Sequence, residues 1–126
     1  MSKLFIVMPA YNEEKNIKAV VEEWYKKLDL PGADDDSRLV VADFGSTDTT
    51  HDILTELKER FRKLEILETD NQFHGPKVLA LYAYAIKNGA SYIFQTDSDG
   101  QTNPQEFDEF WNDRSNFDAI IGNRGG

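Results

Sequence analysis

The stretch FQTDSDGQTNP, residues 94–104, places two aspartates one residue apart directly after an apolar run. The run SYIFQT, residues 91–96, is rich in β-branched and aromatic residues and predicts a strand. If the extended geometry continues, Asp97 and Asp99 point to the same side of the chain. Two carboxylates that close repel each other unless a cation lies between them. Oxygen ligands favour Mg²⁺ or Mn²⁺, and Gln101 could add a carbonyl oxygen.

A second interpretation of the same stretch needs no ligand. Asp, Ser, Gly and Asn are common turn residues, so the segment could be a solvated turn before a helix. Its place at the end of a predicted apolar strand supports the metal interpretation, and both interpretations stay open at this point.

The pattern on either side of this stretch alternates between strands and helices. Predicted strands cover residues 3–8, 38–43, 64–69, 91–96 and 118–123, and predicted helices cover 13–28, 46–61, 75–89 and 103–114. Asn12 is expected to cap the first helix, and Gly89 to end the third. Strand–helix repetition predicts an α/β fold, with a mostly parallel sheet and helices on both faces. The chain stops just after a predicted strand, so the sheet looks unfinished and a longer protein is expected.

Composition narrows the class of protein. The chain has 126 residues, enough for one core, and a formal net charge of -9, which argues against nonspecific nucleic-acid binding. It contains no cysteine, which excludes disulfides and thiolate metal sites and fits a cytoplasmic location. A helix that spans a bilayer needs about 20 apolar residues, and no apolar run in the sequence is that long. The start of the chain does not resemble a signal peptide.

Ligands of parallel α/β sheets bind beyond the carboxyl ends of the strands, so the other predicted strand ends are candidate sites. Pro9 ends the first strand, and Tyr11 after it could flank a planar base. Asp43 ends the second strand, where its carboxylate could accept hydrogen bonds from a nucleobase or a ribose. The alternative for this second segment is a plain turn, with Ser46, Thr47 or Asp48 capping the next helix.

Two basic residues are candidate anion ligands. Lys77 lies near a predicted helix N-terminus, where anions are favoured, although a solvated first-turn charge is the alternative. Arg124 is either a phosphate ligand or part of a frayed chain end. The aromatic residues Trp24, Tyr82, Tyr84 and Trp111 are predicted to pack in the core.

Four motifs in order resemble the family 2 glycosyltransferases of the GT-A fold: IVMPAYNEE, VADFGSTDTT, FQTDSDGQTNP and AIIGNRGG. The last is similar to the corresponding element of polyprenyl- and dolichyl-phosphate sugar transferases. The resemblance implies metal-dependent transfer of a sugar, with inversion, from a UDP- or GDP-linked donor to an acceptor such as polyprenyl phosphate. It implies a donor site made of Pro9, Tyr11, Glu13, Asp43, Lys77, Asp97, Ser98 and Arg124. It implies that Asp97, Asp99 and Gln101 hold Mg²⁺ or Mn²⁺.

The chain also departs from the family pattern. Phe44 replaces the usual second aspartate after the second strand, and this replacement leaves the identity of the nucleobase open. The acceptor-binding part and the general base of the family would lie beyond Gly126, so residues 1–126 are expected to be the nucleotide-sugar-binding part. The full-length protein could then associate with the cytoplasmic face of a membrane.

A non-catalytic nucleotide- or metal-binding module is the alternative. A sugar nucleotidyltransferase is disfavoured, because no G-x-G-x-R loop follows the first strand.

Overall fold

The computed structural model of the chain describes residues 3–30, 32–43, 46–67, 74–96, 104–112 and 121–123. Strands and helices alternate along the sequence. They are β1 Leu4–Ala10, α1 Ile17–Tyr25, a 3-10 helix Lys26–Asp29, β2 Arg38–Asp43, α2 Thr50–Arg60, β3 Leu64–Leu67, α3 His74–Lys87, β4 Tyr92–Gln95, α4 Pro104–Asn112 and β5 Ile121–Asn123.

The five strands form one sheet in the order β3-β2-β1-β4-β5, and every pair of neighbours is parallel. This arrangement confirms the predicted α/β fold. The central strand β1 is buried along its whole length, which explains why its sequence is apolar at every position rather than at alternate ones. In the register of the sheet, Ala10 of β1 lies opposite Asp43 of β2, and Val7 lies opposite Gln95 of β4.

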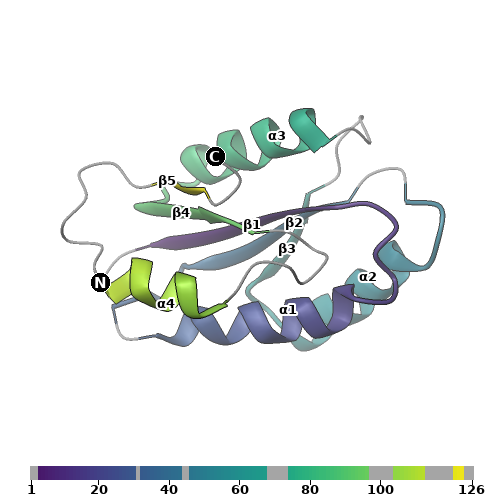
Figure 1. The fold of residues 1–126 in the computed structure, drawn as a ribbon, viewed down its shortest axis with the longest axis horizontal. Coiled ribbons are helices and arrows are strands. Elements are labelled where there is room, and N and C mark those ends of the chain that lie inside the picture. The colour runs from purple at the N-terminus through teal and green to yellow at the C-terminus, as the bar shows by residue number, and fades with distance from the viewer. Residues whose placement is uncertain are drawn as a thin grey trace.

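Helices cover both faces of the sheet, as predicted: α1, α2 and α4 lie on one side and α3 on the other (Figure 1). Successive residues of β1 point to opposite faces. Ile6 and Met8 join the larger core under α1, α2 and α4, while Phe5 and Val7 join the smaller core under α3.

Aromatic side chains divide between these two cores. Trp24 and Trp111 are buried in the larger one, and Tyr82 and Tyr84 pack against the smaller one. The prediction that all four serve core packing is therefore confirmed. Trp24 stacks on Phe94 with 5.6 Å between ring centroids, which joins α1 to β4.

The predicted helix starts are the main error of the sequence analysis. The first helix begins at Ile17 rather than at residue 13, and Asn12 is not its N-cap. The second begins at Thr50 rather than at residue 46. The polar residues before each helix were interpreted as local caps, but most of them bond across to the other loop. Gly89 does follow the end of α3 with a φ of +79°, a conformation that favours glycine.

Among the residues that the structure describes, no helix combines the length and the apolar character needed to cross a membrane.

Candidate functional site

The candidate site lies where the strand order of the sheet reverses. The chain starts the sheet at β1, builds outward through β2 to β3, and then returns to the other side of β1 with β4. In open α/β sheets, the crevice beyond the carboxyl ends of the strands at such a point is the usual ligand site. The loops after β1 and β2 both lie at this edge, on the right of Figure 1.

Hydrogen bonds lock these two loops together. The Thr47 backbone N–H donates to Asn12 Oδ1 at 2.7 Å, and Asn12 Nδ2 donates to Thr47 Oγ1 at 3.2 Å. The Asn12 backbone N–H donates to Ser46 Oγ at 3.1 Å. Asn12 has a φ of +52°, a left-handed conformation that asparagine tolerates better than most residues. Asn12 is therefore a cross-link between two loops.

A second group of contacts continues the link toward α2. The Glu13 N–H donates to Thr50 Oγ1 at 2.8 Å, and the Thr49 N–H donates to Glu14 Oε1 at 3.1 Å. Asp48 Oδ1 accepts from the Thr50 N–H at 2.9 Å, a local turn just before the helix. The N-cap of α2 is Thr49, so the prediction that Ser46, Thr47 or Asp48 caps this helix is wrong. The β1–α1 loop thus packs as a unit with the start of α2.

These contacts set the ionisation of Asp48. Desolvation raises the pKa of its carboxyl, but several hydrogen bonds oppose this effect and leave the pKa below its ordinary value of 3.8. The donors are the Thr50 hydroxyl and the N–H groups of Thr50, Glu14 and Asp48 itself. Donors of this kind favour the charged carboxylate over the neutral acid.

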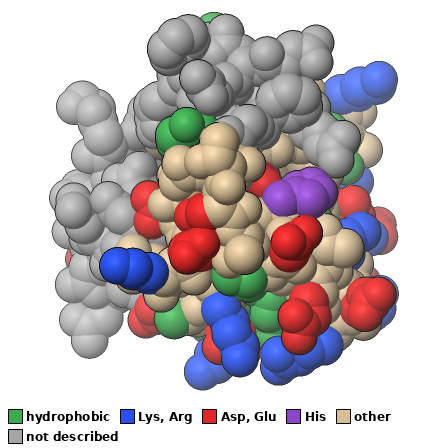
Figure 2. Space-filling view, turned by 90° about the vertical axis from the view of Figure 1, so that its right-hand side faces the viewer, with side chains coloured by type: hydrophobic (Ala, Val, Ile, Leu, Met, Phe, Trp, Pro, Cys, Tyr) green, Lys and Arg blue, Asp and Glu red, His purple; other side chains and the backbone are tan. Residues whose placement is uncertain are grey.

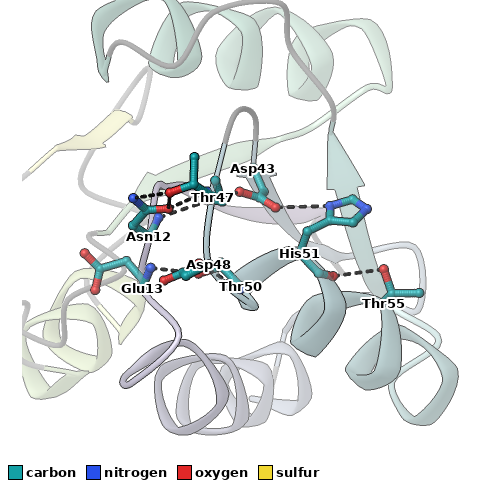
Figure 3. Close-up of polar contacts among 9 residues, drawn as sticks. Asn12, Glu13, Asp43, Thr47, Asp48, Thr50, His51 and Thr55 are labelled. Carbon is teal, nitrogen blue, oxygen red and sulfur yellow. Dashed lines mark hydrogen bonds and ion pairs between the residues drawn. The ribbon is translucent and has the colours of Figure 1, made fainter.

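Asp43 is the buried centre of the site. Asp43 is the last residue of β2, and its side chain is 2% exposed. The Ser46 hydroxyl donates to Asp43 Oδ1 at 2.5 Å, and His51 Nδ1 lies 3.1 Å from Asp43 Oδ2 (Figure 3). A buried carboxylate needs such partners, because leaving a charge unpaired away from water is costly.

The structure brings several of the predicted donor residues to this edge. Tyr11 directly follows β1 and is 40% exposed, Glu13 lies two residues further on and is half-buried, and Asp43 ends the neighbouring strand. Pro9 is buried within β1, opposite Ala42. Acidic side chains gather on this end of the molecule with a histidine beside them (Figure 2).

The other predicted site residues lie outside the described part of the chain. They are Asp97, Ser98, Asp99, Gln101 and Arg124; Lys77 belongs to the first turn of α3, and its side chain is also outside the described part. Within the described residues, no group of three His, Cys, Asp or Glu side chains could hold a metal ion. The predicted metal ligands stay a prediction.

A shallow pocket of about 370 Å³ opens on the β1–α1 loop. Its lining consists of Asn12, Glu13, Glu14, Lys15, Asn16 and Asp48. Three of these side chains are acidic and one is basic, so the pocket itself does not favour a phosphate group.

Sequence reasoning missed three residues of the site: Glu14, Thr50 and His51. The polar run STDTTH, residues 46–51, was a usable signal, because it holds more hydrogen-bonding side chains than one helix cap requires. Nothing in the helical periodicity of α2 indicates that His51 contacts Asp43.

Comparison with known protein families identifies the chain. The sequence model of Glycosyl transferase family 2 matches residues 5–125. The chain belongs to this family. Among curated family members, it is 29% identical over 124 residues to dolichyl-phosphate beta-glucosyltransferase ALG5D of Trichomonas vaginalis. It is 27% identical over 106 residues to ALG5C of the same organism. The matches cover 91% and 82% of the chain, but only 37% and 31% of those relatives.

Solved structures give the same fold. The chain superposes on S. aureus TarS 1-349 in complex with UDP with a TM-score of 0.65 and 22% identity, covering 90% of the chain and 33% of TarS 1-349. It superposes on glucosyl-3-phosphoglycerate synthase from Mycobacterium tuberculosis, also in complex with UDP, with a TM-score of 0.55 and 24% identity. That match covers 78% of the chain and 34% of the synthase. The glycosyltransferase family 2 chain thus spans about a third of these proteins.

Proposed function

We propose that this chain is the nucleotide-sugar-binding part of a glycosyltransferase, which transfers a sugar from a nucleoside-diphosphate sugar to an acceptor with inversion. The observation that carries the proposal is the pair of cross-linked loops after β1 and β2. In support, Ala10 at the end of β1 lies opposite Asp43 at the end of β2, and Tyr11 and Glu13 follow Ala10 in the loop that bonds the start of α2. Ligands of such sheets bind beyond the carboxyl ends of the strands, and the chain belongs to glycosyl transferase family 2.

The nucleoside would be bound by the residues after β1 and β2. Asp43 would accept a hydrogen bond from a base N–H, Tyr11 would flank the ring, and Pro9 and Glu13 would complete the wall. Each oxygen of an ionised carboxylate has two acceptor positions, and the intramolecular bonds from Ser46 and His51 use one on each. Asp43 therefore keeps acceptor capacity for a base that reaches it.

The diphosphate would be bound by the segment after β4. Asp97, Asp99 and Gln101 would hold Mg²⁺ or Mn²⁺, while Ser98, Lys77 and Arg124 would contact the ribose and phosphates. A divalent ion at this place would neutralise charge on the departing nucleoside diphosphate. Supporting this, β4 ends at Gln95 beside β1, at the same edge as the loops described above.

The acceptor proposed for the whole protein is a lipid phosphate of the polyprenyl or dolichyl type. The support is the similarity to two dolichyl-phosphate beta-glucosyltransferases. The acceptor site and the general base would lie outside this chain, which spans 37% of the first of these relatives. A lipid acceptor would place the full-length protein at the cytoplasmic face of a membrane.

Calorimetric titration of the chain tests the donor site. UDP and GDP are each titrated in Mn²⁺ and in EDTA. We expect one of the two nucleotides to bind in Mn²⁺ and at least tenfold more weakly in EDTA, because unshielded carboxylates and phosphates repel each other. Asp99→Asn should abolish the metal effect. Asp36→Asn is the matched control, because Asp36 is exposed and precedes β2, at the opposite edge of the sheet. Equal binding in Mn²⁺ and EDTA would contradict the metal role.

Activity is tested on the full-length protein. UDP-glucose and GDP-mannose are each incubated with dolichyl phosphate, and the glycolipid product is measured with its anomeric configuration. A product with the inverted configuration is expected from one donor. Binding of a donor without transfer or hydrolysis would indicate a module that binds nucleotides without catalysis.

A further inference from the structure

His51 is a site residue to which the proposed donor contacts assign no role. It lies in the first turn of α2, and its side chain points from there toward Asp43 at the end of β2 (Figure 3). His51 is 46% exposed while Asp43 is 2% exposed. The imidazole therefore connects solvent with the buried carboxylate, and it is not part of either hydrophobic core.

The chemistry of the contact between His51 and Asp43 shows which atom carries the shared proton. An ionised carboxylate can only accept hydrogen bonds, so His51 Nδ1 carries the proton that it shares with Asp43 Oδ2. The Ser46 hydroxyl donates to the other oxygen, and Ser46 Oγ in turn accepts the Asn12 backbone N–H. The carboxylate is held by one donor on each oxygen, and it cannot rotate about its Cβ–Cγ bond without losing both.

We propose that His51 is a positioning residue for recognition of the nucleobase, an inference that rests on the proposed donor site. By fixing the plane of the Asp43 carboxylate, His51 aims one of its remaining acceptor positions at a ring N–H of the base. That group is N3–H in uracil and N1–H in guanine. Preorganisation of this kind strengthens the hydrogen bond that carries base discrimination, because the carboxylate need not be ordered on binding.

A purely structural role makes a different prediction. If His51 only satisfies a buried charge, its loss should lower the stability of the fold and weaken the binding of every nucleotide to the same extent. If His51 positions Asp43 for the base, its loss should weaken the binding of a nucleotide that has the ring N–H. The binding of a nucleotide in which a methyl group replaces that hydrogen should stay unchanged.

The experiment compares UDP with 3-methyl-UDP and GDP with 1-methyl-GDP by calorimetry in Mn²⁺, using the full chain. The wild-type chain should prefer the unmethylated form of its nucleotide about tenfold or more, as expected for a hydrogen bond to a charged group. His51→Ala should reduce this preference to about threefold or less. His51→Asn should restore most of it, because the Asn amide can donate to Asp43 Oδ2. Thr55→Ala is the control: the Thr55 hydroxyl bonds the backbone oxygen of His51 and leaves the imidazole in place.

Each remaining outcome overturns the proposal. A His51→Ala chain that keeps the wild-type preference, or that loses equal affinity for both forms, shows a structural role only. A wild-type chain that binds UDP or GDP without preferring the unmethylated form leaves the donor site standing but refutes positioning for the base. A wild-type chain that binds neither UDP nor GDP refutes the donor site and the role of His51 together.

A second measurement does not depend on a variant that folds. Nitrogen-15 NMR of the wild-type imidazole should show a protonated Nδ1 for His51, because Nδ1 faces a carboxylate oxygen that only accepts. The Nε2–H tautomer would contradict the contact with Asp43 on which the proposal depends.

Discussion

Asn12 and Thr47 are 35 residues apart in the sequence, yet the side chain of Asn12 bonds both the backbone and the side chain of Thr47. The two residues follow β1 and β2, whose last residues Ala10 and Asp43 lie opposite each other in the sheet. The contact therefore closes the edge of the sheet where the donor nucleotide is proposed to bind.

Replacing Asn12 should destabilise the fold. Asn12→Ala removes the bonds to Thr47 and places alanine at a φ of +52°, so we expect a loss of about 1–3 kcal/mol in the free energy of unfolding. Asn12→Gly removes the same bonds without the backbone strain and should cost less. Urea unfolding of the two variants measures both effects. Wild-type stability in both would mean that the cross-link contributes nothing.

Asp48 should make stability depend on pH in the acid range. Its folded-state pKa lies below its ordinary value of 3.8, so the ionised form stabilises the fold above that value. This contribution should fall as the pH drops below 3.8 and through the folded pKa. The stability difference between wild type and Asp48→Asn should therefore shrink with acidification in that range, as measured by urea unfolding. A difference that stays constant would contradict the depressed pKa.

Trp24 should be among the most costly core residues to truncate. It is 1% exposed, stacks on Phe94 and meets the edge of Phe107 at 5.7 Å. Trp24→Ala should lower the free energy of unfolding by about 3–5 kcal/mol, because it leaves a cavity between α1, β4 and α4. Ile86→Ala is the control, since Ile86 is 67% exposed and should change stability by less than about 0.5 kcal/mol. Chemical denaturation followed by circular dichroism distinguishes the two.

The ion pair between Lys27 and Asp108 should join α4 weakly to the 3-10 helix. Lys27 Nζ lies 2.8 Å and 3.0 Å from the two carboxylate oxygens, with exposures of 17% for Lys27 and 39% for Asp108. A double-mutant cycle with Lys27→Met and Asp108→Asn should give a coupling of roughly 0.5–1 kcal/mol that decreases at high salt. A coupling that is independent of salt would argue against an electrostatic origin.

The sequence predicted the strands better than the helix starts. The apolar runs of β1 and β2 are unambiguous, because a strand buried on both faces of a parallel sheet is apolar throughout. The starts of α1 and α2 were predicted four residues early, because Asn12 and Ser46 are good capping residue types. In the structure their side chains bond a neighbouring loop or strand instead, which no local pattern indicates.

For the candidate site, the sequence by itself determined the element order, the parallel sheet and the places where strands end in polar residues. These follow from local hydrophobic patterns and from the short connections that α/β units allow. Only the tertiary structure decided that Asn12 meets Thr47 and that Ser46 and His51 hold Asp43. The physical reason is that the register of β1 against β2 brings these loops together, and a register depends on contacts across the whole sheet.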